Sequence, residues 1–292
     1  MKKIKLKNLA AGINENQAVI ECDRIFSMYW QNIVLISALI IVILFVGKFI
    51  IENKILDGDS IFASTISTGD ADAASNDDLS DENAEGETVT KRAYLTFDDG
   101  PSENTDAILD ILAENNVKAT FFVIGKGEEY YDTYRRIVDE GHTLGLHSYS
   151  HVYSEIYASE EDFINDIENL RNLLYDVTGV NSKYYRFPGG STNTVTSVPI
   201  ESLIEYLDEA GITYFDWNAL SGDAVTEGLS PEQLVQNILK DALKYDDTVI
   251  LMHDLDSCDE TVESLQLLID RLTEEGYEIL PIDENAPLIR FK

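Results

Sequence analysis

Residues 91–100 read Lys-Arg-Ala-Tyr-Leu-Thr-Phe-Asp-Asp-Gly, an apolar run that ends in two consecutive acids. The run predicts a buried β-strand, and Gly100-Pro101 predicts a turn directly after it. Asp98 and Asp99 are therefore expected at the tip of a strand. One can bind a metal while the other serves as a base, because a cation stabilises one carboxylate and leaves its neighbour free for proton transfer. Taken alone, the same residues also fit a simple turn.

The alternation of strand and helix patterns continues to residue 292. Further strands are predicted at residues 119–124, 143–146, 184–187, 213–217 and 248–252. Helices, indicated by apolar residues three and four apart, are predicted at residues 106–114, 130–140, 160–177, 199–210, 231–244 and 260–275. This order predicts a parallel α/β fold, either a barrel or an open sheet. Such folds place their active sites at the C-terminal ends of the strands.

A pair of histidines follows the strand predicted at residues 143–146. His147 and His151 are four apart, a spacing that on a helical turn brings both imidazoles to one face. Paired histidines also occur on surfaces and in cores, but three of the chain's four histidines lie within the motifs described here. Together with Asp99 they would leave coordination positions open for water and substrate, as in a catalytic metal site. Zn²⁺ is the first expectation, and Co²⁺, Mn²⁺, Ni²⁺ or Fe²⁺ fit the same ligand types.

Two further strand ends carry one chemical group each. Arg186 precedes Phe187-Pro188-Gly189-Gly190; it is either a surface cation on a turn or the orienting partner of an ionised acid. His253 ends the apolar run of residues 248–252. Histidine ionises near neutral pH, so it is suited to protonating a leaving amine.

In this order the motifs resemble those of the polysaccharide deacetylase family, the NodB-type carbohydrate esterases, and the resemblance extends over residues 91–292. It implies a distorted (β/α) barrel of about seven strands that removes acetyl groups from polysaccharides with a divalent metal. By resemblance Asp98 is the general base, Arg186 its partner and His253 the general acid. The implied metal ligands are Asp99, His147 and His151. The implied substrate-binding positions are Pro188, Gly189 with its backbone N–H, Trp217, and Leu251 at the acetyl methyl group.

Two positions depart from the family pattern. Gly189 stands where many members have an aromatic residue, and this predicts a more open groove. The fourth motif, usually Asp followed by Trp, reads Asp223-Ala224. We expect Asp223 to orient His253, and Asp216 is the competing candidate.

The chain before residue 91 has a different organisation. Residues 33–51 form an almost unbroken apolar run with Lys48 as the only charge, and they are long enough to span a bilayer. Residues 1–32 carry five Lys or Arg, which predicts a cytoplasmic arm, an uncleaved signal anchor and an extracellular C-terminal part. Residues 52–90 include ten acids between positions 57 and 87 and no basic residue there, so a disordered linker is predicted. Residues 91–292 would form the deacetylase domain.

The net charge of the chain and its predicted membrane topology indicate which molecules it is expected to bind. The net charge of −33 excludes nucleic acid as a partner. A single-pass enzyme that faces outward from the cell membrane is expected to act on an acetylated cell-wall glycan, first of all on N-acetylglucosamine in peptidoglycan. Poly-N-acetylglucosamine, chitooligosaccharide and acetylxylan are alternative substrates. A metal-containing wall-binding module without turnover is the non-enzymatic alternative.

Overall fold

The computed structural model describes residues 90–226 and 228–292. The predicted cytoplasmic arm, membrane anchor and acidic linker lie outside the described residues, apart from Thr90. Within the described ranges, no helix combines the length and apolar character that crossing a membrane requires. Apart from residue 227, the described residues coincide with the predicted deacetylase domain, residues 91–292, with Thr90 in addition.

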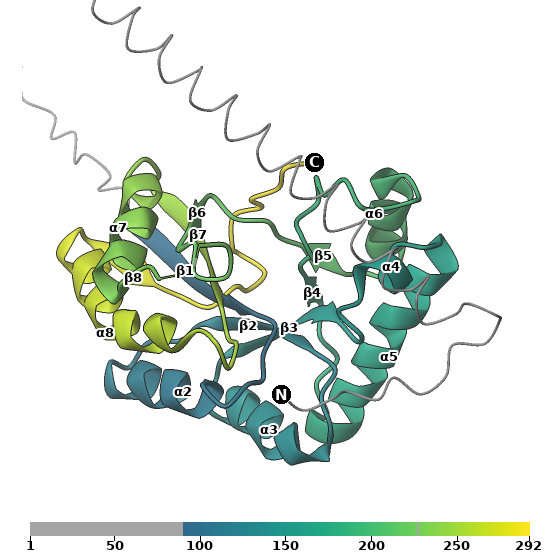
Figure 1. Ribbon diagram of the computed structural model, residues 1–292, viewed down its shortest axis with the longest axis horizontal. Helices are drawn as coiled ribbons and strands as arrows, with labels where there is room; N and C mark the ends of the chain where they lie inside the picture. Colours follow the sequence, from purple (N-terminus) through teal and green to yellow (C-terminus); the bar gives the residue numbers. More distant parts are fainter. Residues whose placement is uncertain (1–89, 227) are drawn as a thin grey trace, which may run out of the picture. The chain divides into compact units, whose positions relative to one another are not determined.

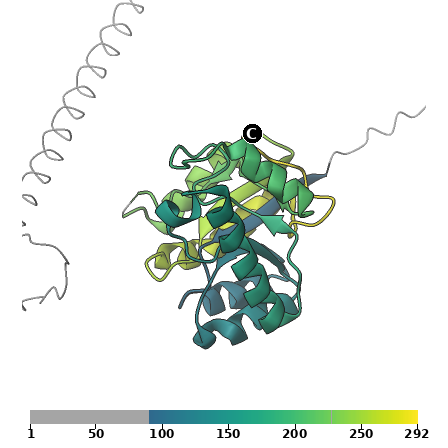
Figure 2. The same ribbon diagram turned by 90° about the vertical axis from the view of Figure 1, so that its right-hand side faces the viewer.

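Seven parallel strands form one curved sheet in the order β5-β4-β3-β2-β1-β7-β6 (Figures 1 and 2). They are β1 (Lys91–Asp98), β2 (Thr120–Ile124), β3 (Thr143–Ser148), β4 (Tyr184–Tyr185), β5 (Thr213–Tyr214), β6 (Ala219–Leu220) and β7 (Asp247–His253). A short β8 (Tyr277–Ile279) pairs with the start of β1 beside this path. Within the described ranges the edge strands β5 and β6 do not pair with each other, so the sheet is a half-barrel. The expected seven strands are confirmed, and the closure of a full barrel is not observed.

The helices lie on the convex side of the sheet and return the chain to the start of the next strand (Figure 1). They are α2 (Thr105–Glu114), α3 (Tyr131–Asp139), α4 (Tyr153–Ile156), α5 (Glu160–Thr178), α6 (Ile200–Glu209), α7 (Pro231–Ala242) and α8 (Asp259–Glu274), with a 3₁₀ turn η1 (Glu128–Tyr130). The ends of the helices are set by neighbouring side chains and by glycine. For example, the Ser159 side chain caps the first turn of α5, and Gly179, at φ 74°, ends that helix in the left-handed conformation.

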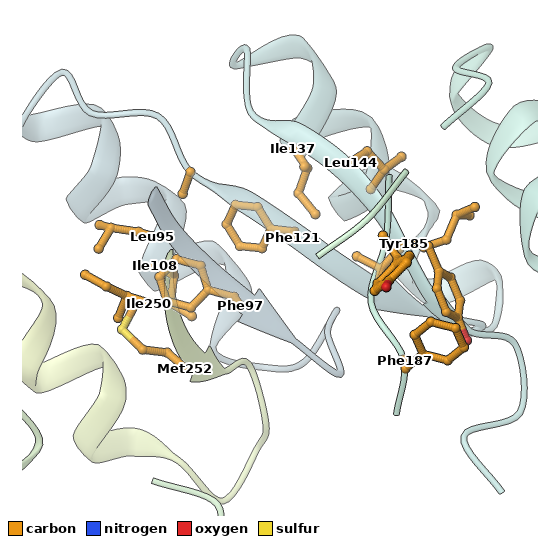
Figure 3. Close-up of a cluster of buried hydrophobic side chains, with 14 of the residues drawn as sticks. Leu95, Phe97, Ile108, Phe121, Ile137, Leu144, Tyr185, Phe187, Ile250 and Met252 are labelled. Atoms are coloured by element: carbon orange, nitrogen blue, oxygen red, sulfur yellow. The ribbon is translucent and has the colours of Figure 1, made fainter. Parts of the chain in front are cut away.

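Strand side chains alternate between the two faces of the sheet. Leu95 and Phe97 of β1 and Phe121 of β2 are fully buried in the core that includes residues of α2 and α3 (Figure 3). Tyr94 and Phe122, their neighbours along the strands, belong to a second cluster in the concave interior. Both faces of the sheet are therefore covered, which is why these strands read as continuous apolar runs.

The second cluster is completed by a segment that follows β8, residues 280–292, here called the closing segment. It starts beside β1, where Leu280 N donates to Ala93 O. Ile282 is buried in the interior cluster. Farther along, Ile289 O accepts from Asp216 N at 2.8 Å, just after β5. The closing segment thus covers the concave interior from β1 to the end of β5 (Figure 1).

Candidate active site

The residues singled out from the sequence converge at the C-terminal ends of the parallel strands. Asp98 ends β1 and His253 ends β7, and the two residues are paired in register across these neighbouring strands. His147 lies near the end of β3, and Arg186 directly follows β4. The edge of the sheet therefore gathers positions that are more than 150 residues apart in the chain.

Three side chains form a compact group of possible metal ligands: Asp99, His147 and His151. One donor atom of each lies within 4.8 Å of the others. Asp99 Oδ1 is 3.3 Å from His147 Nε2 and 3.1 Å from His151 Nε2. The two imidazole rings stack with centroids 5.3 Å apart. The site holds the two nitrogens and one carboxylate oxygen that a catalytic metal centre uses.

Backbone geometry directs these ligands inward. His147 Nδ1 lies 2.8 Å from Arg186 O; since a carbonyl only accepts, Nδ1 carries the proton and Nε2 keeps a free lone pair toward Asp99. Asp99 and His151 have positive φ angles of 75° and 51°. The spacing of the two histidines suggested that a helical turn brings them together. The structure differs, because His151 follows β3 with its backbone in the left-handed conformation. Strained backbone of this kind is typical of functional sites.

A buried carboxylate that sequence reasoning missed holds this turn. Asp166 of α5 accepts hydrogen bonds from Ser148 Oγ at 2.7 Å, Tyr149 N at 2.8 Å and Ser150 N at 2.9 Å. Ser148 Oγ in turn accepts from His151 N. Asp166 lies in the buried stripe of α5, among apolar residues. A charged residue at an apolar position of a periodic helix was the signal that could have found it.

The ligand set fits a divalent cation. Asp99 Oδ1 is buried and has no hydrogen-bond partner in the described part of the chain. Burial raises the pKa of Asp99, but His147, His151 and His253 outweigh that effect and hold its pKa below the usual range. Burial lowers the pKa of His147, but Asp98 and Asp99 outweigh it and raise that pKa. The surroundings therefore keep Asp99 ionised and favour a positive charge next to it. A bound cation would supply that charge.

Asp98, the neighbour of the possible ligand Asp99, is paired with a buried arginine. Arg186 Nη1 donates to Asp98 Oδ1 at 2.9 Å and to Thr96 Oγ1 at 2.6 Å. Nε and Nη2 donate to Phe215 O and Asp216 O. The guanidinium is fully buried and lies 4.3 Å from the centroid of the Phe122 ring. Arg186 is therefore an internal partner of Asp98 and not a surface cation on a turn.

His253 is held by Asp223. Its Nδ1 lies 2.8 Å from Asp223 Oδ1, and its backbone N–H donates to Oδ2. Thr261 of α8 also donates to Oδ2. Burial lowers the pKa of His253, but the hydrogen bond and charge of Asp223 outweigh burial and raise it. Nδ1 carries a proton toward the carboxylate, so Nε2 is the nitrogen available to a substrate.

The competing candidate, Asp216, has different partners. It is fully buried, and its oxygens accept from Ser191 N at 2.8 Å, Ser191 Oγ, and Phe291 N at 2.7 Å. It therefore ties the loop after β4 to the closing segment. Of the two acids, the structure brings only Asp223 to His253.

The four predicted substrate-binding positions lie near these groups but differ in exposure. Leu251 of β7 and Pro188 are buried, Trp217 is half-buried, and Gly189 is exposed. Gly189 N–H donates to no group in the described part of the chain, so it is free for a ligand. An aromatic ring does lie at Gly189: a Cβ there would be 3.4 Å from Tyr153 Oη and 3.5 Å from its ring. Tyr153 of α4 therefore places an aromatic side chain next to Gly189.

A second carboxylate that the sequence did not reveal joins β7 to the loop after β1. Asp254 is fully buried, and it accepts from Ser102 Oγ and Thr105 Oγ1. Its backbone N–H donates to Asp98 O at 2.8 Å. A Cβ on Gly100 would overlap Asp254 Oδ2, so any larger residue there would require the Asp254 carboxylate to move. Asp254 thereby fixes the turn that carries Asp98 and Asp99.

Known proteins that are similar to this chain in sequence or in structure include several deacetylases. The family model for polysaccharide deacetylase matches residues 85–214. A peptidoglycan-N-acetylglucosamine deacetylase of Bacillus cereus is 34% identical over 201 residues, covering 67% of this chain and 71% of that protein. A bifunctional xylanase/deacetylase of Pseudobutyrivibrio xylanivorans is 32% identical over 197 residues, covering 66% of this chain and 30% of that protein. The crystal structure of the catalytic domain of a peptidoglycan N-acetylglucosamine deacetylase from Eubacterium rectale has a TM-score of 0.67 and 36% identity, covering 73% of this chain and 97% of that one.

The fold, the Asp-His-His group and these matches define a carbohydrate-directed hydrolase. The chain belongs to the polysaccharide deacetylase family. Asp99, His147 and His151 are its candidate site for a divalent metal.

Proposed function

We propose that the protein is a membrane-anchored N-deacetylase that hydrolyses the acetamide of N-acetylglucosamine in peptidoglycan outside the cell membrane. The observation that carries the chemistry is the pairing of Asp98 with Arg186 and of His253 with Asp223 beside the Asp-His-His group. The names of the Bacillus and Eubacterium relatives support peptidoglycan as the polymer. The apolar residues 33–51 support the anchor.

In this proposal Asp98 takes the proton of the attacking water. Arg186 fixes the carboxylate through Oδ1, which leaves Oδ2 for proton transfer. Asp99, His147 and His151 would hold a divalent metal, Zn²⁺ by ligand type, which when bound would supply Lewis acidity for the attack on the acetyl group. The Gly189 N–H is the backbone donor for the negative charge that develops on the carbonyl oxygen.

His253 then protonates the departing glucosamine nitrogen through Nε2. Asp223 supports this role twice, because it fixes the ring through Nδ1 and raises the pKa of the imidazole. Since Asp98 and His253 are register partners on adjacent strands, base and acid face one reaction centre from neighbouring positions. Leu251 and Trp217 are proposed to contact the acetyl group and the sugar.

A second candidate keeps the removal of an acetyl group and changes the polymer, and for acetylxylan the bond broken is an ester in place of an amide. The xylanase/deacetylase relative is 32% identical, close to the 34% of the peptidoglycan enzyme. Acetylxylan, poly-N-acetylglucosamine and chitooligosaccharide are therefore the substrates to test beside peptidoglycan. A wall-binding module without turnover is disfavoured, because glycan binding alone does not require a buried Asp–Arg pair and an oriented histidine.

The test is acetate release by the purified full-length protein from peptidoglycan and from the three other glycans. Each reaction is run as purified, with a chelator, and after Zn²⁺ or Co²⁺ is restored. We expect metal-dependent release that is fastest on peptidoglycan, and glucosamine in the digested product. Equal or faster release from acetylxylan would reject the proposed substrate, and no release from any glycan would reject the proposed activity.

A further inference from the structure

Two aromatic rings from distant parts of the chain meet beside the candidate active site. Trp217 follows β5, and Phe291 lies in the closing segment. Their ring centroids are 5.1 Å apart, and the ring planes are inclined by 77°. We call this pair the aromatic platform.

The platform borders the catalytic groups. The Arg186 guanidinium, which holds Asp98, lies 5.8 Å from the centroid of the Trp217 ring. A Cβ on Gly190 would lie 3.1 Å from the Trp217 ring and 3.4 Å from the Phe291 ring. Both rings thus pack on the residue that follows Gly189, whose N–H is the proposed oxyanion donor. A ligand held at Gly189 is within reach of the platform.

The backbone of Phe291 is fixed on both sides although its ring is exposed. Its N–H donates at 2.7 Å to the buried Asp216 carboxylate, and the next carbonyl, Lys292 O, accepts from Tyr214 Oη. The residue Phe291 nevertheless remains 45% exposed. An aromatic ring that is exposed but anchored loses little conformational entropy when a ligand packs on it.

The chemistry of the platform fits a sugar ring. A pyranose has faces of C–H groups that pack on aromatic rings, while its hydroxyl groups stay in water. Half-buried Trp217 and exposed Phe291 offer apolar area without charge at a site otherwise rich in carboxylates. The two rings therefore offer apolar surface beside the reaction centre on which one face of a sugar ring can pack.

We propose that Trp217 and Phe291 form a subsite that binds a pyranose ring of the glycan chain, and that the closing segment is thereby part of substrate recognition. This proposal rests on the proposed function for the identity of the glycan. It assigns a binding role to Phe291, which no sequence motif identifies.

The first test compares Phe291→Ala, Phe291→Leu and Phe291→Tyr with the wild-type full-length protein on the N-acetylglucosamine tetramer. We expect Phe291→Ala and Phe291→Leu to raise KM about threefold to tenfold, with kcat within about twofold, and Phe291→Tyr to behave as wild type. The control is Leu288→Ala, in the same segment and 58% exposed, which should leave KM unchanged. If Phe291→Leu restores the wild-type KM, the ring only packs on its neighbours and the proposal is wrong.

The second test measures binding without turnover. The chain has two tryptophans, so Trp30→Phe leaves Trp217 as the only indole reporter. We expect the tetramer to change Trp217 fluorescence, and the Phe291→Leu variant to weaken that binding by the same factor as KM. If wild type binds the tetramer but releases no acetate from it, from peptidoglycan or from the other glycans, the proposed function fails and the subsite stands. If the tetramer leaves the fluorescence unchanged at any concentration, the subsite itself is rejected.

Discussion

Replacing Arg186 with methionine should remove a large part of the stability of the domain. The guanidinium is fully buried and donates to four acceptors: Thr96 Oγ1, Asp98 Oδ1, Phe215 O and Asp216 O. Asp98 is only 3% exposed, so the variant leaves a buried carboxylate without its counter-charge. Removing one partner of a buried ion pair costs about 3–5 kcal/mol. In a domain of this size that lowers Tm by about 6–20 °C, at about 2–4 °C per kcal/mol.

The assay is thermal and urea unfolding followed by circular dichroism, with chelator present so that metal binding adds nothing to stability. Asp98→Asn and the double variant Asp98→Asn/Arg186→Met complete a cycle. Because the double variant has neither charge, its loss should be smaller than the sum of the single losses by about 1–3 kcal/mol. Strict additivity, or a loss below about 1 kcal/mol for Arg186→Met, would show that the pair does not stabilise the fold as argued.

Three further predictions concern residues that act around the site. Asp223→Asn removes the charge that raises the pKa of His253, so the alkaline limb of the kcat/KM–pH profile should move to lower pH; an unchanged limb would contradict the assignment. Asp166→Ala should weaken Zn²⁺ or Co²⁺ binding about 10–100-fold in a chelator competition, since it frees the turn that carries His151 without removing a ligand. Gly100→Ala should destabilise the domain by about 1–3 kcal/mol in urea unfolding, because the new methyl group overlaps Asp254; a stability equal to wild type would mean that the turn relaxes freely.

The sequence predicted the strand ends well because their chemistry is local. An apolar run followed by Asp98-Asp99 or by His253 places those side chains at the edge of a parallel sheet, and the structure has them there. The elements not predicted, α4, η1, β6 and β8, are only two to four residues long. Patterns that short contain too few positions to show a period of 2 or 3.6.

The hydrogen-bond partners of the supporting carboxylates could not be assigned from the sequence for a different reason. Asp166, Asp216 and Asp254 each act on backbone and hydroxyl groups far along the chain or in another loop. Nothing in their immediate neighbours indicates those partners. The sequence also left two candidates, Asp223 and Asp216, for the acid that orients His253. Only the folded chain shows that Asp223 reaches this histidine.

The closing segment is synthesised after the active-site residues, and this sets the order in which the parts of the fold can form. During translation, the residues of the metal group and of both proton-transfer pairs leave the ribosome before residues 280–292 do. A nascent chain that has just completed β7 already contains every one of those groups, yet Asp216 still lacks its bond to Phe291, and the concave interior still lacks Ile282. The interior of the half-barrel is therefore completed only after the active-site residues have been synthesised, by residues that are themselves neither metal ligands nor proton donors.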